Sequence, residues 1–120
     1  MKKFTAKVIT GDGRGHEIGF PTINLDITNL DLNLDFGVYA SRVSVNGKIY
    51  AGAMNYGPRP TFNKNLPAME VHLLNFLGDL YNIEVEVEIL GKIRDIEKFN
   101  SKEELIEQIK KDVEAVKKQF

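Results

Sequence analysis

Residues 11–25, GDGRGHEIGFPTINL, contain side chains and glycines that together can bind phosphate. Gly11, Gly13 and Gly15 recur at alternate positions, and Arg14 lies among them. Glycine lets successive backbone N–H groups approach an anion closely, and arginine adds a charge-assisted donor. The spacing matches neither a P-loop nor a dinucleotide-binding fingerprint. Taken alone, the glycines therefore favour an ordinary surface loop, and the residues that follow them carry the case for a phosphate site.

The sequence FPTIN at residues 20–24 places a hydroxyl and an amide two positions apart. If this segment is extended, Thr22 and Asn24 lie on the same side of it. Mg²⁺ prefers oxygen ligands and usually keeps phosphate oxygens and waters in its shell. Thr22 and Asn24 thus indicate a magnesium-nucleotide site beside the glycine loop. The alternative is a turn in which both side chains cap their own backbone.

Glu70 lies in the apolar stretch AMEVHLLNF at residues 68–76, which has the pattern of a strand. Strand alternation predicts that Glu70 shares a face with His72, Leu74 and Phe76, so its surroundings are partly apolar. A carboxylate there is a candidate general base, although an exposed glutamate on a solvent face is the commoner case. For His72 we expect a strand-face histidine with a hydrogen-bond partner and no catalytic role.

Antiparallel strands are expected to position these groups. Asn46-Gly47 is a strong signal for a two-residue hairpin, because both residues tolerate the positive φ of a type I′ turn. In the last predicted strand, Ile83, Val85, Val87 and Ile89 alternate with glutamates, which indicates one core face and one solvated face. The predicted strands cover residues 4–10, 36–45, 48–55, 68–76 and 82–94.

The C-terminal residues 101–119 form an amphipathic helical pattern. Ser101 and Glu104 have the spacing of a capping box, and an apolar stripe follows at helical spacing. Five or six antiparallel strands with one terminal helix favour a small closed or Greek-key barrel, since closure removes exposed strand edges. An open sheet with a helix on one face is the alternative.

Composition narrows the class of protein further. The chain has 120 residues, no cysteine and a formal net charge of −1. Disulfides and thiolate metal sites are therefore excluded, and no global field would recruit nucleic acid. The lack of cysteine offers no case for secretion, so we expect a cytoplasmic protein. Because no long apolar run occurs, we expect no membrane segment.

Several of these segments occur together in a known family. The stretches GDGRGHEIGFPTINL, GVYASRVSVNGKIYAGAMNYGPRPTF, MEVHLLNF, DLYNIEVEVEILGKIR and KFNSKEELIEQIKKD have the order and approximate spacing of the riboflavin kinase domain, which this chain resembles. In bacteria that domain usually forms the C-terminal half of a bifunctional riboflavin kinase and FMN adenylyltransferase. The resemblance implies a mainly β fold, a six-stranded antiparallel Greek-key (split) barrel with one C-terminal helix. It also implies one domain over residues 1–120, with the barrel in 4–99 and the helix in 101–119.

The resemblance further implies an activity and site residues. ATP and Mg²⁺ would be used to phosphorylate riboflavin at its 5′-hydroxyl, giving FMN and ADP. Glu70 would be the general base, and Thr22 with Asn24 would hold Mg²⁺. The ATP-binding residues would be Gly11, Gly13, Arg14, Gly15, Leu73, Asn75 and Tyr81. The flavin-binding residues would be Arg94, Glu97 and Phe99, although Phe99 is equally consistent with a hydrophobic staple before the helix.

The sequence departs from the family pattern at three points. We expect no adenylyltransferase half beside this domain, in which case FMN would be the end product. Glu17 lies near a position where some relatives carry a lysine close to ATP, and residues 95–97 read Asp-Ile-Glu instead of the common Pro-Glu-Lys. These changes make a non-catalytic flavin or FMN-binding module the main alternative.

A barrel that binds single-stranded nucleic acid ranks last, because the chain lacks the basic groove that such binding uses. We therefore expect no nucleic-acid partner. The resemblance implies small-molecule substrates, riboflavin and ATP, and a monomer.

Overall fold

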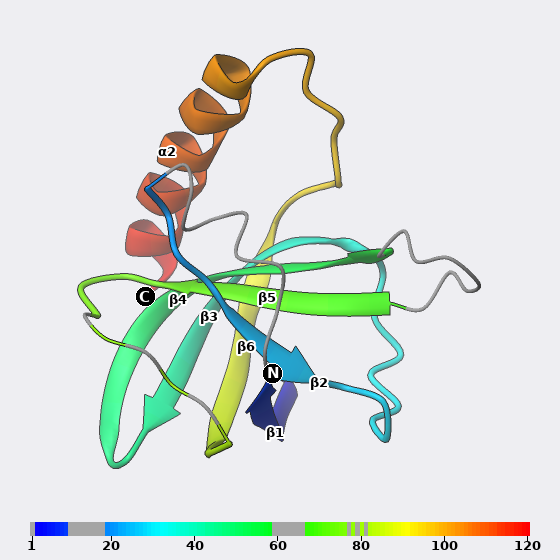
Figure 1. The fold of residues 1–120 in the computed structure, drawn as a ribbon, viewed down its shortest axis with the longest axis vertical. Coiled ribbons are helices and arrows are strands. Elements are labelled where there is room, and N and C mark those ends of the chain that lie inside the picture. Colours follow the sequence, from blue (N-terminus) through cyan, green and yellow to red (C-terminus); the bar gives the residue numbers. More distant parts are fainter. Residues whose placement is uncertain (1, 10–18, 59–66, 77, 79, 81) are drawn as a thin grey trace.

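The computed structural model describes residues 2–9, 19–58, 67–76, 78, 80 and 82–120. Within these residues, six antiparallel strands close into a barrel in the order β1-β2-β5-β4-β3-β6, and one helix follows them (Figure 1). The barrel and terminal helix confirm the predicted fold. The elements are β1 (Lys2–Ile9), β2 (Ile23–Asp26), β3 (Gly37–Val45), β4 (Lys48–Pro58), β5 (Pro67–Leu73), β6 (Glu84–Arg94) and α2 (Lys102–Gln119).

Alternation along the strands fills the barrel interior. On β6, Val85 and Val87 are buried in the central cluster, as the sequence predicts. On β3, Tyr39 and Val43 point into the same cluster. Burial raises the pKa of the Tyr39 hydroxyl, which donates to the Asp35 carbonyl at 2.7 Å. The apolar interior therefore holds the strands in one register.

The β3–β4 hairpin turns at Asn46 and Gly47, with φ values of 49° and 87°. Both are positive, as a type I′ turn requires, so the hairpin prediction is confirmed. β4 continues to Pro58, beyond the predicted end at residue 55, because it keeps pairing with β5 as far as Pro67.

The prediction for residues 68–76 is wrong at its C-terminal end. β5 ends at Leu73, and Asn75 adopts a left-handed conformation with φ of 61°. This turn redirects the chain, so Phe76 packs against the central cluster and its ring meets Tyr50 edge-on at 5.2 Å. Phe76 therefore does not share the face of Glu70. A similar left-handed residue, Asn82 with φ of 59°, delays the start of β6.

The acidic face of β6 is only partly solvated. Glu84 and Glu86 are exposed, as expected. Glu88 is different, because its carboxylate pairs with the Arg42 guanidinium at 2.8 Å and only 16% of its side chain is exposed. The prediction of a solvated acidic face is therefore wrong at Glu88, because the neighbouring strand β3 supplies a cation that cannot be inferred from the sequence of β6.

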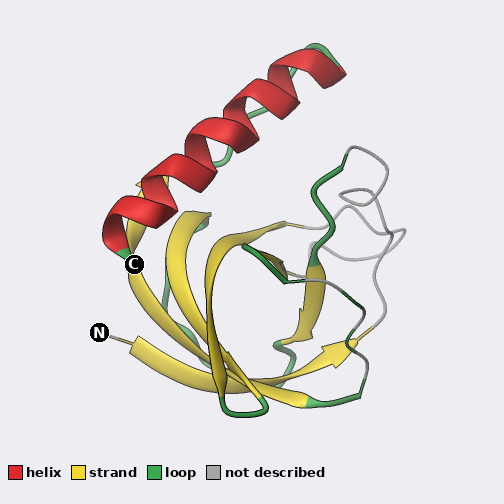
Figure 2. Cartoon of the chain, turned by 90° about the vertical axis from the view of Figure 1, so that its left-hand side faces the viewer, coloured by secondary structure: helices red, strands yellow, loops and turns green. Residues whose placement is uncertain are grey.

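Helix α2 lies against the outside of the barrel, where it contacts β3, β4 and β6 (Figure 2). Val116 is fully buried there in a second small apolar cluster with Ala40, Ala51 and Leu74. No helix within the described residues is long and apolar enough to cross a membrane.

The helix begins with the predicted cap. The Ser101 hydroxyl accepts a hydrogen bond from the Glu104 N–H at 3.1 Å. The Glu104 carboxylate accepts from the Asn100 N–H at 3.2 Å. It thus reaches one residue further back than the reciprocal contact of a capping box.

Replacing Ser101 with Ala removes this cap and leaves the Glu104 N–H without its side-chain acceptor. We expect the free energy of unfolding to fall by about 1 kcal/mol. Urea denaturation would measure the loss, and Ser101→Asp serves as the control because aspartate also caps well. Equal stability of the Ala and Asp variants would contradict the role of the cap.

Candidate active site

The pairing of β2 with β5 brings three predicted site residues together. Asn24 lies directly opposite Glu70 in the antiparallel register. The Thr22 hydroxyl donates to the Glu70 carboxylate with an Oγ1–Oε2 distance of 3.3 Å. Asn24 is buried and Glu70 is half-buried. The segment is extended, as required, so a hydroxyl, an amide and a carboxylate converge on one face of the sheet.

Strand β2 is short, and its neighbours fix it on both sides. Asn24 faces Ile9 on β1 as well as Glu70 on β5. Just after Asn24, Leu25 points into the barrel core. At the end of the strand, the N–H and hydroxyl of Thr28 donate to the Asp26 carboxylate at 3.1 and 2.7 Å, and these bonds hold the pKa of Asp26 below its usual range. The site therefore rests on a strand held at both edges and at its end.

Asn55 is a polar neighbour that the sequence analysis did not single out. It lies opposite Glu70 on the other side, in the β4–β5 pairing, so Glu70 stands between two amides in a row across β2, β5 and β4. Directly opposite side chains in such a row are about 5 Å apart at Cβ. Local alternation cannot reveal this neighbour, because it depends on which strand pairs with β5.

His72 lies two residues after Glu70 on the same outward face. Its Nδ1 is 2.9 Å from the Pro21 carbonyl oxygen. Its ring meets the ring of Phe20 edge-on, with centroids 5.6 Å apart at 81°. The prediction of a hydrogen-bonded strand histidine is thus confirmed.

The oxygen groups at this site fit a hard cation. The Thr22 hydroxyl hydrogen points to Glu70, which leaves lone pairs on its oxygen for another partner. Mg²⁺ is often bound by one or two protein oxygens together with phosphate and water. No three His, Cys, Asp or Glu side chains gather into a metal-binding group in the part of the chain that the structure describes. The chemistry of the Thr22–Asn24 pair is therefore compatible with a magnesium-phosphate complex.

The residues expected to bind ATP divide into two groups. Leu73 ends β5 with its side chain in the barrel core, and Asn75 is exposed in the turn that follows. The others lie outside the described residues, so their role stays a prediction: Gly11, Gly13, Arg14, Gly15 and Tyr81. His16 and Glu17 also lie outside the described residues.

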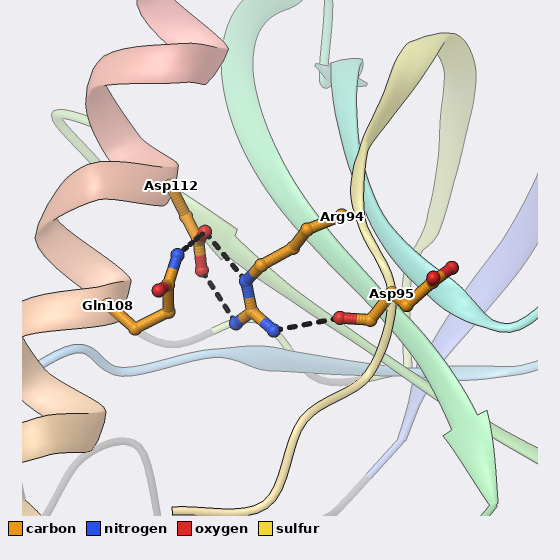
Figure 3. Close-up of polar contacts among 4 residues, drawn as sticks. All are labelled: Arg94, Asp95, Gln108 and Asp112. Carbon is orange, nitrogen blue, oxygen red and sulfur yellow. Dashed lines mark hydrogen bonds and ion pairs between the residues drawn. The ribbon is translucent and has the colours of Figure 1, made fainter.

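Arg94, expected to contact flavin, is engaged by the helix. Its Nε and Nη2 donate to the two oxygens of Asp112, each at 2.9 Å, and Gln108 donates to the same carboxylate at 3.0 Å (Figure 3). Its Nη1 donates to the Asp95 carbonyl at 3.1 Å. The side chains of Arg94 and Asp112 are only 14% and 5% exposed. This bidentate pair joins the end of β6 to the middle of α2.

Glu97 and Phe99 border a surface groove of about 440 Å³ between the β6–α2 connection and the helix. Gln108 and Lys111 line its helical side. The Arg94 guanidinium lies over the Phe99 ring at 5.7 Å, so the three residues expected to bind flavin lie near one another.

The connection starts at a second ion pair. Lys92 Nζ and Asp95 Oδ1 are 2.6 Å apart. The hydrogen bond between them raises the pKa of Lys92 and lowers that of Asp95.

A family model described as riboflavin kinase (flavokinase) matches residues 2–120. The chain belongs to the riboflavin kinase family. Membership agrees with the barrel and with the resemblance seen in the sequence.

Three relatives illustrate this membership. The chain is 40% identical over 116 residues to the bifunctional riboflavin kinase/FMN adenylyltransferase of Bacillus subtilis (strain 168), covering 94% of this chain and 37% of that protein. It is 40% identical to the RNA-binding riboflavin kinase RibR of the same organism, covering 100% of this chain and 52% of RibR. A riboflavin kinase structure from Trypanosoma brucei superposes with a TM-score of 0.65 at 27% identity, covering 98% of this chain and 80% of that one.

The chain thus spans between about a third and a half of the length of these Bacillus relatives. Because RibR is described as RNA-binding, the expectation that this riboflavin kinase family member binds no nucleic acid stays a prediction.

Proposed function

We propose that this protein is a riboflavin kinase, which transfers the γ-phosphoryl group of ATP to the riboflavin 5′-hydroxyl and gives FMN and ADP. The observation that carries the proposal is the convergence of Thr22, Asn24 and Glu70 where β2 pairs with β5. Family membership supports the substrate and the reaction. Phosphoryl transfer needs mainly positioning and electrostatic stabilisation, with one carboxylate to orient the hydroxyl.

In this proposal Glu70 is the general base. The 5′-hydroxyl oxygen forms a bond to the γ-phosphorus, the bond to the ADP oxygen breaks, and the hydroxyl proton passes to the Glu70 carboxylate. The Thr22 hydroxyl donates to one oxygen of that carboxylate and so fixes its orientation. An ionised carboxylate accepts hydrogen bonds on two oxygens, so Glu70 can in principle accept the substrate proton as well as the Thr22 bond.

Thr22 and Asn24 would hold Mg²⁺. The ion would neutralise charge on the ATP phosphates when bound. Gly11, Gly13, Arg14 and Gly15 would contact those phosphates.

The other proposed contacts follow the family pattern. Leu73, Asn75 and Tyr81 would border the nucleotide. Glu97 and Phe99 would contact flavin at the groove beside α2, with Arg94 positioned there by Asp112.

Incubating the protein with riboflavin, Mg²⁺ and each of several nucleoside triphosphates, followed by chromatography, tests the proposal. We expect FMN and the nucleoside diphosphate to appear in equal amounts. Bound flavin with no FMN or diphosphate formed would instead select the non-catalytic flavin-binding module.

Replacing Thr22 with Val or Asn24 with Ala should weaken magnesium binding, because each change deletes one proposed oxygen ligand. The Mg²⁺ concentration for half-maximal rate is expected to rise by at least about tenfold, on the scale of losses seen when a metal site is disturbed. Titrating Mg²⁺ at fixed ATP and riboflavin measures the change. Thr5→Val, on the exposed face of β1, is the matched control and should leave the titration unchanged. Unaltered magnesium dependence in both site variants would show that the ion binds elsewhere.

A further inference from the structure

We infer that His72 is a positioning residue that fixes the Pro21 carbonyl and thereby holds the Thr22 hydroxyl against Glu70. The inference rests on the proposed function, since it assigns His72 a part in building the same site. The relevant contacts are the 2.9 Å approach of His72 Nδ1 to the Pro21 oxygen and the 3.3 Å bond from Thr22 to Glu70.

The backbone pairing of β2 with β5 does not include Thr22. The paired residues of β2 and β5 begin at Ile23, which lies opposite Val71, so Thr22 precedes the first of these pairs. Pro21 has no N–H and offers only its carbonyl for hydrogen bonding. The Pro21 carbonyl lies in the same peptide plane as the nitrogen and Cα of Thr22. A hydrogen bond that fixes this carbonyl therefore also fixes the orientation of the Thr22 backbone at its N-terminal side. The His72 side chain therefore supplies a link that the ladder lacks.

The chemistry of the contact assigns the proton. A carbonyl oxygen only accepts, so Nδ1 of His72 must donate and must carry a hydrogen. In the neutral ring, Nε2 is then the acceptor. The imidazolium also has a hydrogen at Nδ1, so the bond to Pro21 is kept in both charge states.

Phe20 restrains the ring that makes this bond. The Phe20 ring meets the imidazole edge-on, with the two ring centroids 5.6 Å apart, and this contact limits rotation of the imidazole. Phe20 itself borders a smaller groove against α2, beside Val113 and Lys117. The segment that precedes Thr22 therefore contacts His72 twice, through the Phe20 ring and through the Pro21 carbonyl.

Two variants distinguish the effect of the Nδ1–H hydrogen bond from that of the rest of the His72 ring. In His72→Asn the side-chain amide nitrogen takes the place of Nδ1, whereas in His72→Gln it takes the place of Nε2 and is too far along the side chain to bond Pro21 in the same way. Calorimetric titration of the full chain with Mg²⁺ in the presence of ADP measures the effect without catalysis. We expect His72→Gln to weaken Mg²⁺ binding about threefold to tenfold, as expected for loss of one hydrogen bond, and His72→Asn to stay within about twofold of the wild type.

A spectroscopic measurement on the wild-type protein makes the test independent of variant folding. Long-range ¹H–¹⁵N NMR should show His72 Nδ1 with the shift of a protonated nitrogen at every pH. A neutral ring protonated at Nε2 would overturn the inference, as would wild-type Mg²⁺ affinity in His72→Gln or an equal loss in both variants. Failure of the wild type to form FMN would instead defeat the proposed function, while the tautomer and the Mg²⁺–ADP titrations would still decide the role of His72.

Discussion

Replacing Glu70 with Gln is expected to lower kcat for FMN formation by about 100- to 10,000-fold, the range associated with loss of a general base. Glutamine keeps the length of the side chain and an oxygen that can accept from the Thr22 hydroxyl. It cannot take up the proton of the 5′-hydroxyl. Initial rates of FMN formation at saturating ATP and riboflavin measure the effect.

The Glu70→Gln variant should still bind riboflavin and Mg²⁺–ADP, which calorimetry would show. Glu86→Gln is the matched control, because Glu86 is exposed on the outer face of β6 and pairs with β1 and β3 instead of the site strands. Full turnover by Glu70→Gln would mean that the base is assigned to the wrong residue.

Replacing Asp112 with Ala should be the most destabilising of the changes considered. The change removes the carboxylate that accepts hydrogen bonds from Nε and Nη2 of Arg94. A largely buried guanidinium is then left without its counter-charge. Breaking a buried pair in this way costs about 3–5 kcal/mol. That is a large share of the roughly 5–15 kcal/mol that stabilises a typical domain. Urea denaturation followed by far-UV circular dichroism measures the loss.

A double variant separates the buried charge from the packing. Arg94→Met with Asp112→Leu replaces both partners with apolar side chains, and such replacements are often close to neutral. We expect it to recover most of the stability lost in Asp112→Ala. A loss below about 1 kcal/mol in the single variant, typical of an exposed pair, would contradict the importance of the contact.

Features set by local sequence could be predicted well. The Asn46-Gly47 turn, the alternation of β6 and the Ser101 cap each depend on residues close together in the chain. Errors arose where a distant residue intervened or a turn was not recognised. Arg42 neutralises Glu88 from another strand, and the left-handed Asn75 ends β5 before Phe76.

The candidate site was predicted only in part, for the same reason. Residue type and family resemblance both indicated Thr22, Asn24 and Glu70. Thr22 and Glu70 are 48 positions apart in the sequence, however, and the pairing of β2 with β5 brings them together. Asn55 and the His72–Pro21 contact depend on strand order and register. A local pattern carries no information about either.

The Arg94–Asp112 ion pair is another contact that a local sequence pattern does not predict, and it concerns a residue expected to bind flavin. The family resemblance implies that Arg94 contacts flavin, whereas in the structure its guanidinium forms an ion pair with Asp112 on α2. The assignment of Arg94 to flavin stays a prediction, and its contact with Phe99 keeps it next to the groove where flavin is proposed to bind.

A crystal structure of the complex with riboflavin, ADP and Mg²⁺ tests the central claim most directly. We predict Mg²⁺ about 2.1 Å from oxygens of Thr22 and Asn24. The riboflavin 5′-hydroxyl should lie about 2.6–3.2 Å from the Glu70 carboxylate. Magnesium and the 5′-hydroxyl bound away from the β2–β5 pairing would contradict the assignment of this site to phosphoryl transfer.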